Sequence, residues 1–479
     1  MDYPILDVPV IGGSLVIAGV AIVHVLIAHF AVGAGLFNAV HESLANRRGD
    51  ATMLAFLRAH SRFIILFPFI AGALTGVGIW VTIGLIAPVE TSNLIHLFVW
   101  GWATEWSLFI VEIAAGYIYY YTWGRLAPRI HNAIGWIYAV AALGSLVLIN
   151  GIISFMLTPG ANPTPETFWQ NLFNPSFWPS TFIRTISGLA LAAIFVIIVV
   201  NYNRRFTHEQ RHHVIRQASP WLLPLVLMVP LAWWYFTVIP PDARNFIFNQ
   251  SAMVMVLMFT FGVVASILIT VYALLGIVRG GRYVTGETGF LLLAIALIAT
   301  GSMEFVREGI RKPFVGRPAD NKASAFEGLY STELTPSELR RTEQVGTLTE
   351  AKWFQDERAS LDPVVRGRAI FRIQCSACHT ADGAYNPAKP LVHGWTVEQF
   401  DSNLMNLHAT KDAMPHYHPT KSDRADLAAF LQWLGGVKQD QPESLAPPTP
   451  TPSPSPSPAP TPGRRPRPVR RPAPTPSTN

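Results

Sequence analysis

The sequence predicts an all-α protein: an eight-helix transmembrane bundle, a C-terminal soluble helical domain and a disordered Pro-rich tail. Three observations predict this fold class. Half of the 479 residues are hydrophobic and only 14% are charged, with a mean hydropathy of +0.30, which is too apolar for a soluble protein of this length. Apolar stretches of about twenty residues recur before the last third of the chain. A compact polar segment and a run rich in proline, serine and threonine follow them.

The apolar stretches are the predicted membrane-spanning helices. They cover approximately residues 9–38, 62–87, 95–121, 132–157, 182–202, 219–239, 251–278 and 287–309. The first has no basic region ahead of it and is far longer than the apolar core of a secretory signal, so we do not expect a cleaved signal peptide.

Arginine is distributed unevenly between the two sides of the predicted bundle. The loops after the first, third, fifth and seventh spans carry Arg47, Arg48, Arg58, Arg62, Arg125, Arg129, Arg204, Arg205, Arg211, Arg216, Arg279 and Arg282, whereas the opposite loops carry only Arg244. The positive-inside rule therefore places the N-terminus and everything after the eighth span outside. We expect a bacterial inner-membrane protein whose soluble domain is periplasmic. These loops and a basic tail explain the net charge of +6, so no nucleic-acid partner is expected.

The only two cysteines lie in the run Cys375-Ser-Ala-Cys378-His379. Two thiols at this spacing can bond the two vinyl groups of a haem, and the adjacent histidine then becomes the proximal ligand of the iron. The motif therefore predicts one covalent haem c, which bacteria attach on the outer side of the membrane. A disulfide framework is excluded, and no thiol is left for a zinc site. The alternative is a structural or redox Cys-x-x-Cys that happens to precede a histidine.

The residues around this motif have the pattern of a small haem-binding domain. An amphipathic segment, Val364–Phe371, stands directly before the motif, and another, Ala425–Leu434, closes the domain. This arrangement resembles class I cytochrome c, in which the first and last helices cross. The resemblance implies that Gly367 and Phe371 meet Trp433 at the crossing.

We expect Met414 to be the second axial ligand of this haem. It precedes Pro415 in a loop before the last helix, where the family carries its thioether ligand, and a thioether raises the potential relative to a second imidazole. The competing side chains are His393, Met405, His408, His416 and His418.

The chain is expected to have four parts. The membrane domain covers 1–311, a polar linker with a short helix around 336–344 covers 312–360, and the cytochrome c domain covers 361–437. Residues 438–479 cannot bury a core and should be disordered. Their arginines, between 464 and 471, favour an anionic surface such as membrane lipid headgroups.

Ionisable residues inside the apolar spans are costly and are usually retained for a task. They are His24 and His29 in the first span, Glu105 and Glu112 in the third, Arg184 in the fifth, and Glu304, Arg307, Glu308 and Arg311 at the end of the eighth. Imidazole and carboxylate can both ligate a noncovalent haem between helices. Pairing or packing is the alternative for each residue, and it is favoured for His29 and His96.

The order of these residues resembles subunit I of the cytochrome bd-type oxidases. The matching segments are His24 with His41-Glu42-Ser43, Glu112 with Trp123-Gly-Arg125-Leu126, His131 with Trp136 and Asn150-Gly151, and Glu308-Gly-Ile-Arg311-Lys-Pro313-Phe314. The resemblance implies that His24 binds a high-spin haem and that Glu308, in a signature shared with Arg311, is an axial ligand of a b-type haem. It also implies one or two noncovalent haems of the b or d type and a second membrane subunit of the subunit II type.

Two departures from the family bear on the route of electrons. Arg184 stands in the span that carries the histidine of the family's low-spin haem, and a guanidinium cannot ligate iron because it stays protonated. That site is therefore lost or rebuilt, with Met253 as the remaining candidate ligand. The quinol-binding loop is reduced to about 238–249, and the cytochrome c domain replaces the family's last helix.

These features predict a cytochrome c-dependent bd-like terminal oxidase, an oxidoreductase of the respiratory chain. Cytochrome c or another periplasmic donor would deliver electrons to the domain, and oxygen would be reduced near His24 and Glu308. Glu105 and Glu112 would relay protons, with pairing between helices as their alternative role. A second hypothesis is a non-oxidase cytochrome b/c subunit that transfers electrons between quinol and a periplasmic acceptor. A third is a membrane anchor that has lost its noncovalent haems.

Overall fold

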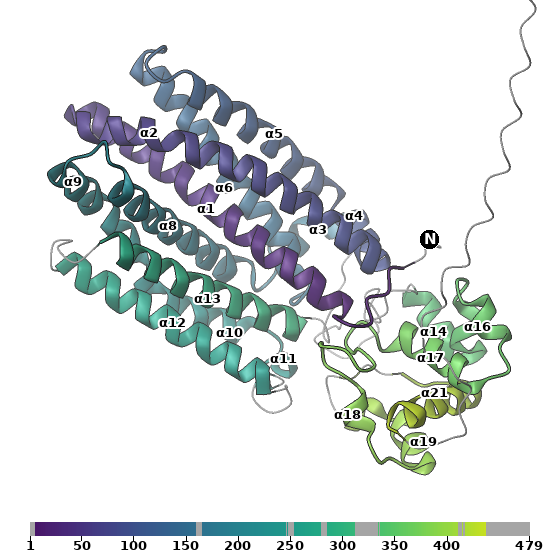
Figure 1. Cartoon of the computed structure of the whole chain (residues 1–479). Helices are drawn as coiled ribbons and strands as arrows, with labels where there is room; N and C mark the ends of the chain where they lie inside the picture. The colour runs from purple at the N-terminus through teal and green to yellow at the C-terminus, as the bar shows by residue number, and fades with distance from the viewer. Residues whose placement is uncertain are drawn as a thin grey trace, which may run out of the picture. The chain divides into compact units, whose positions relative to one another are not determined.

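The chain is almost entirely helical (Figure 1). The computed structural model describes residues 5–159, 165–245, 247, 253–278, 285–311, 334, 336–410, 414 and 417–436. No strand occurs among these residues, which contain only one isolated bridge, between Thr380 and Pro387. The predicted all-α class is confirmed. The predicted disordered tail, 438–479, lies outside the described residues, as does its basic stretch at 464–471.

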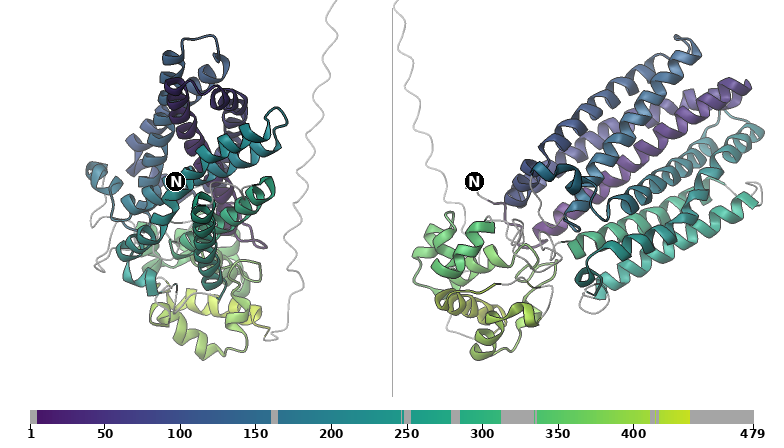
Figure 2. Two further views of the ribbon diagram at one scale, coloured as in Figure 1. Left: turned by 90° about the vertical axis from the view of Figure 1, so that its left-hand side faces the viewer. Right: turned by 180° about the vertical axis from the view of Figure 1, so that it is seen from behind.

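The membrane domain is built from long helices that run side by side (Figure 2). The longer helices are α1 (Gly13–Arg48), α2 (Ala51–Phe67), α3 (Ala73–Ile86), α5 (Val99–Tyr121), α6 (Pro128–Phe155), α8 (Phe177–Tyr202), α12 (Met253–Val278) and α13 (Gly286–Arg311). The shorter ones are α4 (Pro88–Leu97), α7 (Phe168–Leu172), α9 (His208–Ala218), α10 (Met228–Val238) and α11 (Pro241–Asn245). In the described part of the chain, seven stretches are long and apolar enough to cross a membrane, and the pair α4–α5, bent by 85°, would make an eighth. This agrees with the predicted bundle.

The first helix is longer than the sequence predicted. It continues beyond residue 38 to Arg48, and α2 begins at Ala51, so Arg47 and Arg48 lie in the last turn of α1. Basic side chains are favourable there because the carboxyl end of a helix carries a partial negative charge. Gly49 closes the helix with a φ of 67°, and the Asp50 side chain accepts a bond from the Met53 amide at the start of α2.

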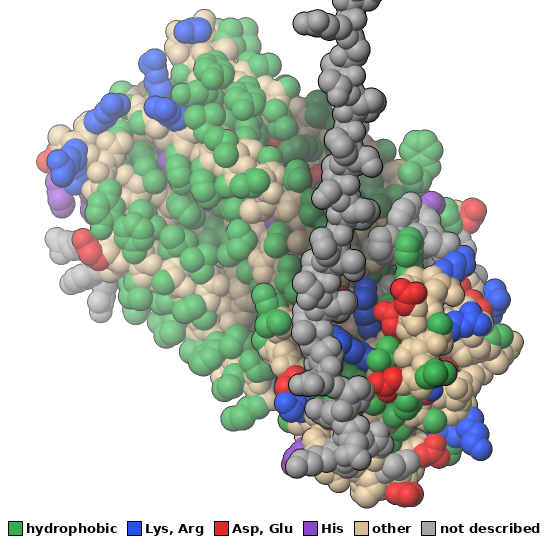
Figure 3. Space-filling view, turned by 45° about the vertical axis from the view of Figure 1, so that its right-hand side comes forward, with side chains coloured by type: hydrophobic (Ala, Val, Ile, Leu, Met, Phe, Trp, Pro, Cys, Tyr) green, Lys and Arg blue, Asp and Glu red, His purple; other side chains and the backbone are tan. Residues whose placement is uncertain are grey.

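Helix α1 lies at the centre of the bundle, where it packs against α6, α8 and α13. Its closest approach is to α8. A Cβ atom on Gly33 would lie 1.9 Å from the carbonyl oxygen of Gly188, so only glycine allows the two backbones to touch here. Phe30 and Phe37 of α1 are completely buried beside this crossing. Hydrophobic side chains cover the flank of the bundle, and basic side chains gather at one of its ends (Figure 3), as expected for a membrane protein.

The C-terminal domain is a second, smaller helical unit. Its helices are α14 (Pro336–Val345), α15 (Thr347–Glu350), α16 (Gln355–Ala359), α17 (Pro363–Gln374), α18 (Lys389–Val392), α19 (Val397–Met405), α20 (Leu407–Thr410) and α21 (Lys421–Leu434). Helices α17 and α21 cross, as predicted, and a Cβ on Gly367 would lie 1.9 Å from the carbonyl oxygen of Asp426.

The aromatic contact at this crossing differs from the expected one. Phe371 packs against Phe430, with ring centroids 5.4 Å apart, and Trp433 stacks on Phe430 with ring centroids 6.0 Å apart. Trp433 therefore supports the contact through Phe430. Two aromatic residues three positions apart share one face of α21, and the sequence alone did not show which of them faces α17.

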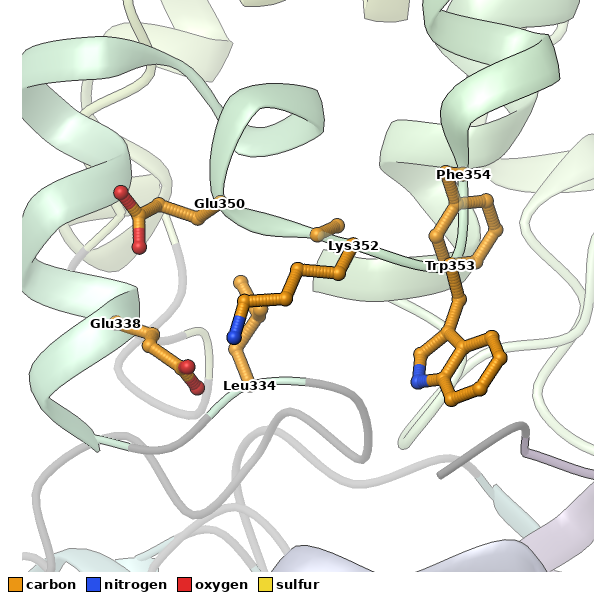
Figure 4. Close-up of a pocket in the computed structure, with 7 residues that line it drawn as sticks. Leu334, Glu338, Glu350, Lys352, Trp353 and Phe354 are labelled. Atoms are coloured by element: carbon orange, nitrogen blue, oxygen red, sulfur yellow. The ribbon is translucent and has the colours of Figure 1, made fainter. Parts of the chain in front are cut away.

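The segment predicted as a linker contributes to the core of the C-terminal domain. Its short helix is present as α14, and Leu334, Leu348 and Phe354 are buried in the same cluster as Phe371. A small pocket opens beside α14 and α15, where the side chains of Glu338 and Lys352 extend toward one another (Figure 4). Its lining contains no histidine, cysteine or methionine, so it does not supply ligands for haem iron.

Candidate haem-binding sites

The Cys-x-x-Cys-His motif continues directly from the end of α17. The amides of Cys378 and His379 both donate to the carbonyl of Cys375, at 3.1 and 2.9 Å, which adds one more turn after the helix. Both thiols and the imidazole therefore lie on one turn of backbone. This is the arrangement that covalent haem attachment requires.

The orientation of His379 fits a haem ligand. Its Nδ1 lies 3.0 Å from the carbonyl oxygen of Asn386. A carbonyl only accepts, so Nδ1 carries the proton and the ring's lone pair is on Nε2, which is the tautomer that binds iron. Asn386 has a φ of 43°, and its side chain donates to the carbonyl of Cys378 at 2.9 Å. Sequence reasoning did not find Asn386, since a loop residue seven positions from its partner leaves no periodic signal.

The chemistry of the thiols also bears on the motif's role. Burial raises the pKa of the Cys375 thiol to about 12, so this thiol is neutral near pH 7. Dithiol redox sites depend on a thiolate of lowered pKa. The structure therefore favours haem attachment over the redox alternative.

The loop before α21 carries the candidates for the second axial ligand. Met414 is half-buried there. Its competitors are placed less favourably: His393 Nδ1 bonds to the Gly435 carbonyl at 3.0 Å, His418 is exposed, and Met405 is 50% exposed. His416 and the side chain of His408 lie outside the described residues. Met414 stays a prediction.

In the membrane domain, His24 has the same tautomer as His379. Its Nδ1 lies 3.0 Å from the Thr75 hydroxyl oxygen on α3. The Thr75 hydroxyl has one proton, and its shortest bond is the 2.7 Å donation to the Ala71 carbonyl; with the proton there, the Thr75 oxygen accepts from His24 Nδ1. The lone pair of the ring is therefore on Nε2, as a haem ligand requires. Gly76 adjoins the ring, where a Cβ would lie 3.2 Å from Cε1.

Arg184 is held in a buried ionic network, defined here as His29, Arg184, Glu304, Arg307 and Glu308. Arg184 Nη2 lies 3.0 Å from Glu304 Oε1, and its Nη1 is 3.3 Å from His29 Nε2. Arg307 bonds to the other oxygen of Glu304 and to Glu308, each at 2.7 Å. Because guanidinium only donates, the Nε2 lone pair of His29 is used by Arg184. The residues around Arg184 therefore do not fit a low-spin haem whose iron ligand is at position 184.

Of the other predicted ligands, only Glu308 joins this network, through Arg307. His24 is paired elsewhere, with Thr75. Met253 begins α12 and is 77% exposed, unlike a side chain that ligates a buried haem. The side chain of Arg311 lies outside the described residues. Sequence reasoning named Glu304 but missed that it pairs with Arg184, because a contact between α8 and α13 leaves no signal in the spacing of either helix.

The two predicted proton carriers lie on one face of α5. Glu112 is buried, and Glu105 accepts a 2.7 Å bond from the Ser145 hydroxyl of α6. They are seven residues apart, which is two helical turns or about 10 Å along the axis. Further along the bundle, Glu42 on α1 and His131 on α6 form a buried pair at 2.7 Å.

Comparison with known sequences assigns both domains. The family of cytochrome bd terminal oxidase subunit I matches residues 15–237, and the family of cbb3-type cytochrome c oxidase subunit III matches residues 362–434. The chain joins a membrane domain like cytochrome bd oxidase subunit I to a cytochrome c domain. The two matches together make it a haem-containing, electron-transferring membrane protein. Helices α12 and α13 of this bd-type domain lie beyond the matched residues.

Individual relatives agree with this assignment. A cytochrome c-553-like protein of Synechocystis is 35% identical over 75 residues, which are 14% of this chain and 67% of that protein. The structure of bd oxidase from Geobacillus thermodenitrificans matches this chain with a TM-score of 0.56 and 14% sequence identity. The match covers 67% of this chain and 89% of the oxidase chain. At this identity the second likeness shows the fold alone.

Proposed function

We propose that this chain is the oxygen-reducing subunit of a bd-like terminal oxidase that receives its electrons through its own cytochrome c domain. The observation that carries the proposal is the Arg184 network. In the position from which the family ligates its low-spin haem, this chain has an arginine bonded to Glu304 and His29. The low-spin haem site through which the family receives electrons is therefore replaced in this chain. The fused cytochrome c domain would receive the electrons instead.

His24 and His379 would hold the two kinds of haem that this function needs. A haem held by His379 would carry one electron at a time, and a haem held by His24 would supply oxygen binding and reduction. Both rings have their proton on Nδ1, bonded to Asn386 and Thr75. These second partners fix the ring orientation and make Nε2 more basic. Glu308 and Met414 are the proposed further ligands.

Oxygen reduction consumes protons, and Glu105 and Glu112 are suited to deliver them. They are carboxylates on one helix, and Ser145 orients Glu105 through its hydroxyl. A carboxylate that is shielded from bulk water can take up and release a proton during turnover. We further propose that the cytochrome c domain lies in the periplasm and that a c-type cytochrome donates electrons to it. A second membrane subunit of the subunit II type would complete the oxidase.

A second function is favoured by one contact. Glu308 is bonded to Arg307, which occupies one oxygen of a proposed iron ligand. This favours a non-oxidase cytochrome b/c subunit that transfers electrons between quinol and a periplasmic acceptor.

Oxygen uptake by the purified full-length protein, with any co-purifying subunit, separates these functions. Reduced cytochrome c and a quinol are supplied in separate assays, and a Cys375→Ala/Cys378→Ala variant serves as the control. The oxidase consumes oxygen with reduced cytochrome c, and the double variant loses this activity. Quinol-driven uptake that survives in the double variant would overturn the proposed electron route. No uptake with either donor, together with no carbon monoxide binding, would favour the non-oxidase carrier.

A further inference from the structure

The residues before α1, together with the first two residues of α1, form a strap, Ile5–Ser14, that bonds to both domains. The Leu6 amide donates to the carbonyl of Leu85, near the end of α3, at 2.9 Å. The neighbouring carbonyl, that of Ile5, accepts from Arg372 Nη2 of α17 at 2.8 Å. Adjacent residues of the strap are thus attached to the membrane domain and to the cytochrome c domain.

The strap then follows the loop that carries the haem-attachment motif. The Ala384 amide donates to the Val10 carbonyl at 2.8 Å, and the Ser14 hydroxyl donates to the Ala377 carbonyl at 2.6 Å. Ala377 lies between Cys375 and Cys378. The first turn of α1 is therefore bonded to the segment that attaches the haem.

Two glycines make this close approach possible. A Cβ on Gly383 would lie 2.4 Å from the Pro9 carbonyl oxygen and 2.5 Å from that of Val10. Gly12 has a φ of 92°, and its Cβ would lie 2.8 Å from Cβ of Tyr385. Any larger residue at either position would push the strap away from the loop.

We propose that the Ile5–Ser14 strap docks the cytochrome c domain on α1 and that Ser14 positions the connection through which electrons enter the membrane domain. This inference rests on the proposed function. The connection runs from Cys378 through the Ala377 carbonyl to the Ser14 hydroxyl, and then along α1 to His24. Ser14 and His24 are ten residues apart on one helix, about 15 Å along its axis. A haem bound by Cys375, Cys378 and His379 would give up one electron in each transfer, and an acceptor held at His24 would take up that electron. No proton would move in this step, and under the proposed function oxygen would be the final oxidant.

The position of the strap in the chain agrees with this role. The match to the oxidase family begins at residue 15, and the match to the cytochrome c family begins at residue 362. The strap belongs to neither matched region. A segment that serves the junction between two domains is expected to lie outside the families of both.

Two pairs of variants of the full-length protein test the strap. Ser14→Ala removes the hydroxyl, whereas Ser14→Thr retains it. Gly383→Ala drives a Cβ into the strap, whereas Gly84→Ala, in α3, meets nothing within 4 Å. The measured rate is re-oxidation of the c-type haem after rapid reduction by a soluble donor. We expect Ser14→Ala and Gly383→Ala to slow it by about tenfold, with an unchanged haem c potential, and Ser14→Thr and Gly84→Ala to retain it.

Hydrogen exchange at the Ala384 amide provides a readout that does not depend on oxygen reduction. Gly383→Ala should speed this exchange, and Gly84→Ala should not. If wild-type protein reduces no oxygen but exchange changes as expected, the docking stands and the proposed function fails. Unchanged exchange in Gly383→Ala, or an unchanged internal rate in Ser14→Ala, would overturn the strap's role while leaving the proposed function intact.

Discussion

Two histidines five residues apart on α1 have opposite surroundings. His24 donates from Nδ1 to Thr75 and keeps its Nε2 lone pair for a ligand, whereas the Nε2 lone pair of His29 accepts from Arg184. We propose the first as a haem ligand, whereas the second belongs to an ionic network. A buried cation must be paired, and Arg184 is bonded to Glu304 and His29. The partners of each histidine therefore distinguish the two roles.

The largest expected effect follows from replacing His24. His24→Ala should remove the carbon monoxide-binding haem and lower oxygen uptake by more than about a hundredfold, because a first ligand outweighs its supporting partners. His29→Ala should retain the carbon monoxide difference spectrum and is the matched control. An unchanged spectrum in His24→Ala would reassign the ligand to His29 or His96.

The Arg184 network predicts a loss of stability rather than of haem. Arg184→Leu should destabilise the membrane domain by about 3–5 kcal/mol, because it leaves the Glu304 carboxylate buried with one partner fewer. Thermal unfolding in detergent, followed by helical circular dichroism, measures this change. The double variant Arg184→Leu/Glu304→Leu should recover part of the loss. Arg184→Leu with wild-type stability would show that the network does not hold the helices together.

The helix crossing in the cytochrome c domain predicts a smaller effect. Gly367→Ala places a Cβ 1.9 Å from the Asp426 carbonyl oxygen, so α17 and α21 must separate. Overpacking of this kind costs about 1–3 kcal/mol, and the melting of the haem c Soret band in the full-length protein reports it. A melting temperature equal to that of the wild type would contradict the tight crossing.

Asp423 predicts the smallest effect, a pH dependence of the same domain. Burial raises the pKa of this carboxyl, which accepts bonds from the amide and hydroxyl of Thr347 at 2.6 Å each. Since the folded-state pKa lies above the unfolded value, the stabilising contribution is complete below about pH 4 and is lost as pH rises through the folded pKa. Soret melting across this range should show the slope, and Asp423→Asn should flatten it. A slope that persists in Asp423→Asn would assign it to another group.

Features set by local sequence could be predicted in both domains, whereas contacts between separate segments could not. The cytochrome c domain is specified by local signals: Cys375, Cys378 and His379 lie within five residues, and Gly367 lies in the helix directly before them. The membrane spans were equally clear, because length and hydropathy determine them. Asn386 and Thr75, which set the tautomers of the two proposed ligand histidines, were not predictable, since each depends on a contact between separate segments.

The ionic network around Arg184 is another case in which contacts between separate segments could not be predicted from the sequence. Arg184 was recognised as unable to ligate iron from its chemistry alone. Its partners lie on α1 and α13, more than a hundred residues away in each direction, and nothing in the spacing of single helices revealed that they meet. The strap was missed for a related reason: residues 5–14 have no motif, and backbone groups make most of its bonds.

Haem stoichiometry of the purified full-length protein tests the central claim most directly. Pyridine haemochrome quantification counts covalent and noncovalent haem, and magnetic circular dichroism separates six-coordinate low-spin from high-spin iron. The account predicts one covalent c-type haem per chain, together with noncovalent haem that is high-spin and disappears in His24→Ala. A noncovalent six-coordinate low-spin haem in the wild-type protein would contradict the replacement of that site by Arg184.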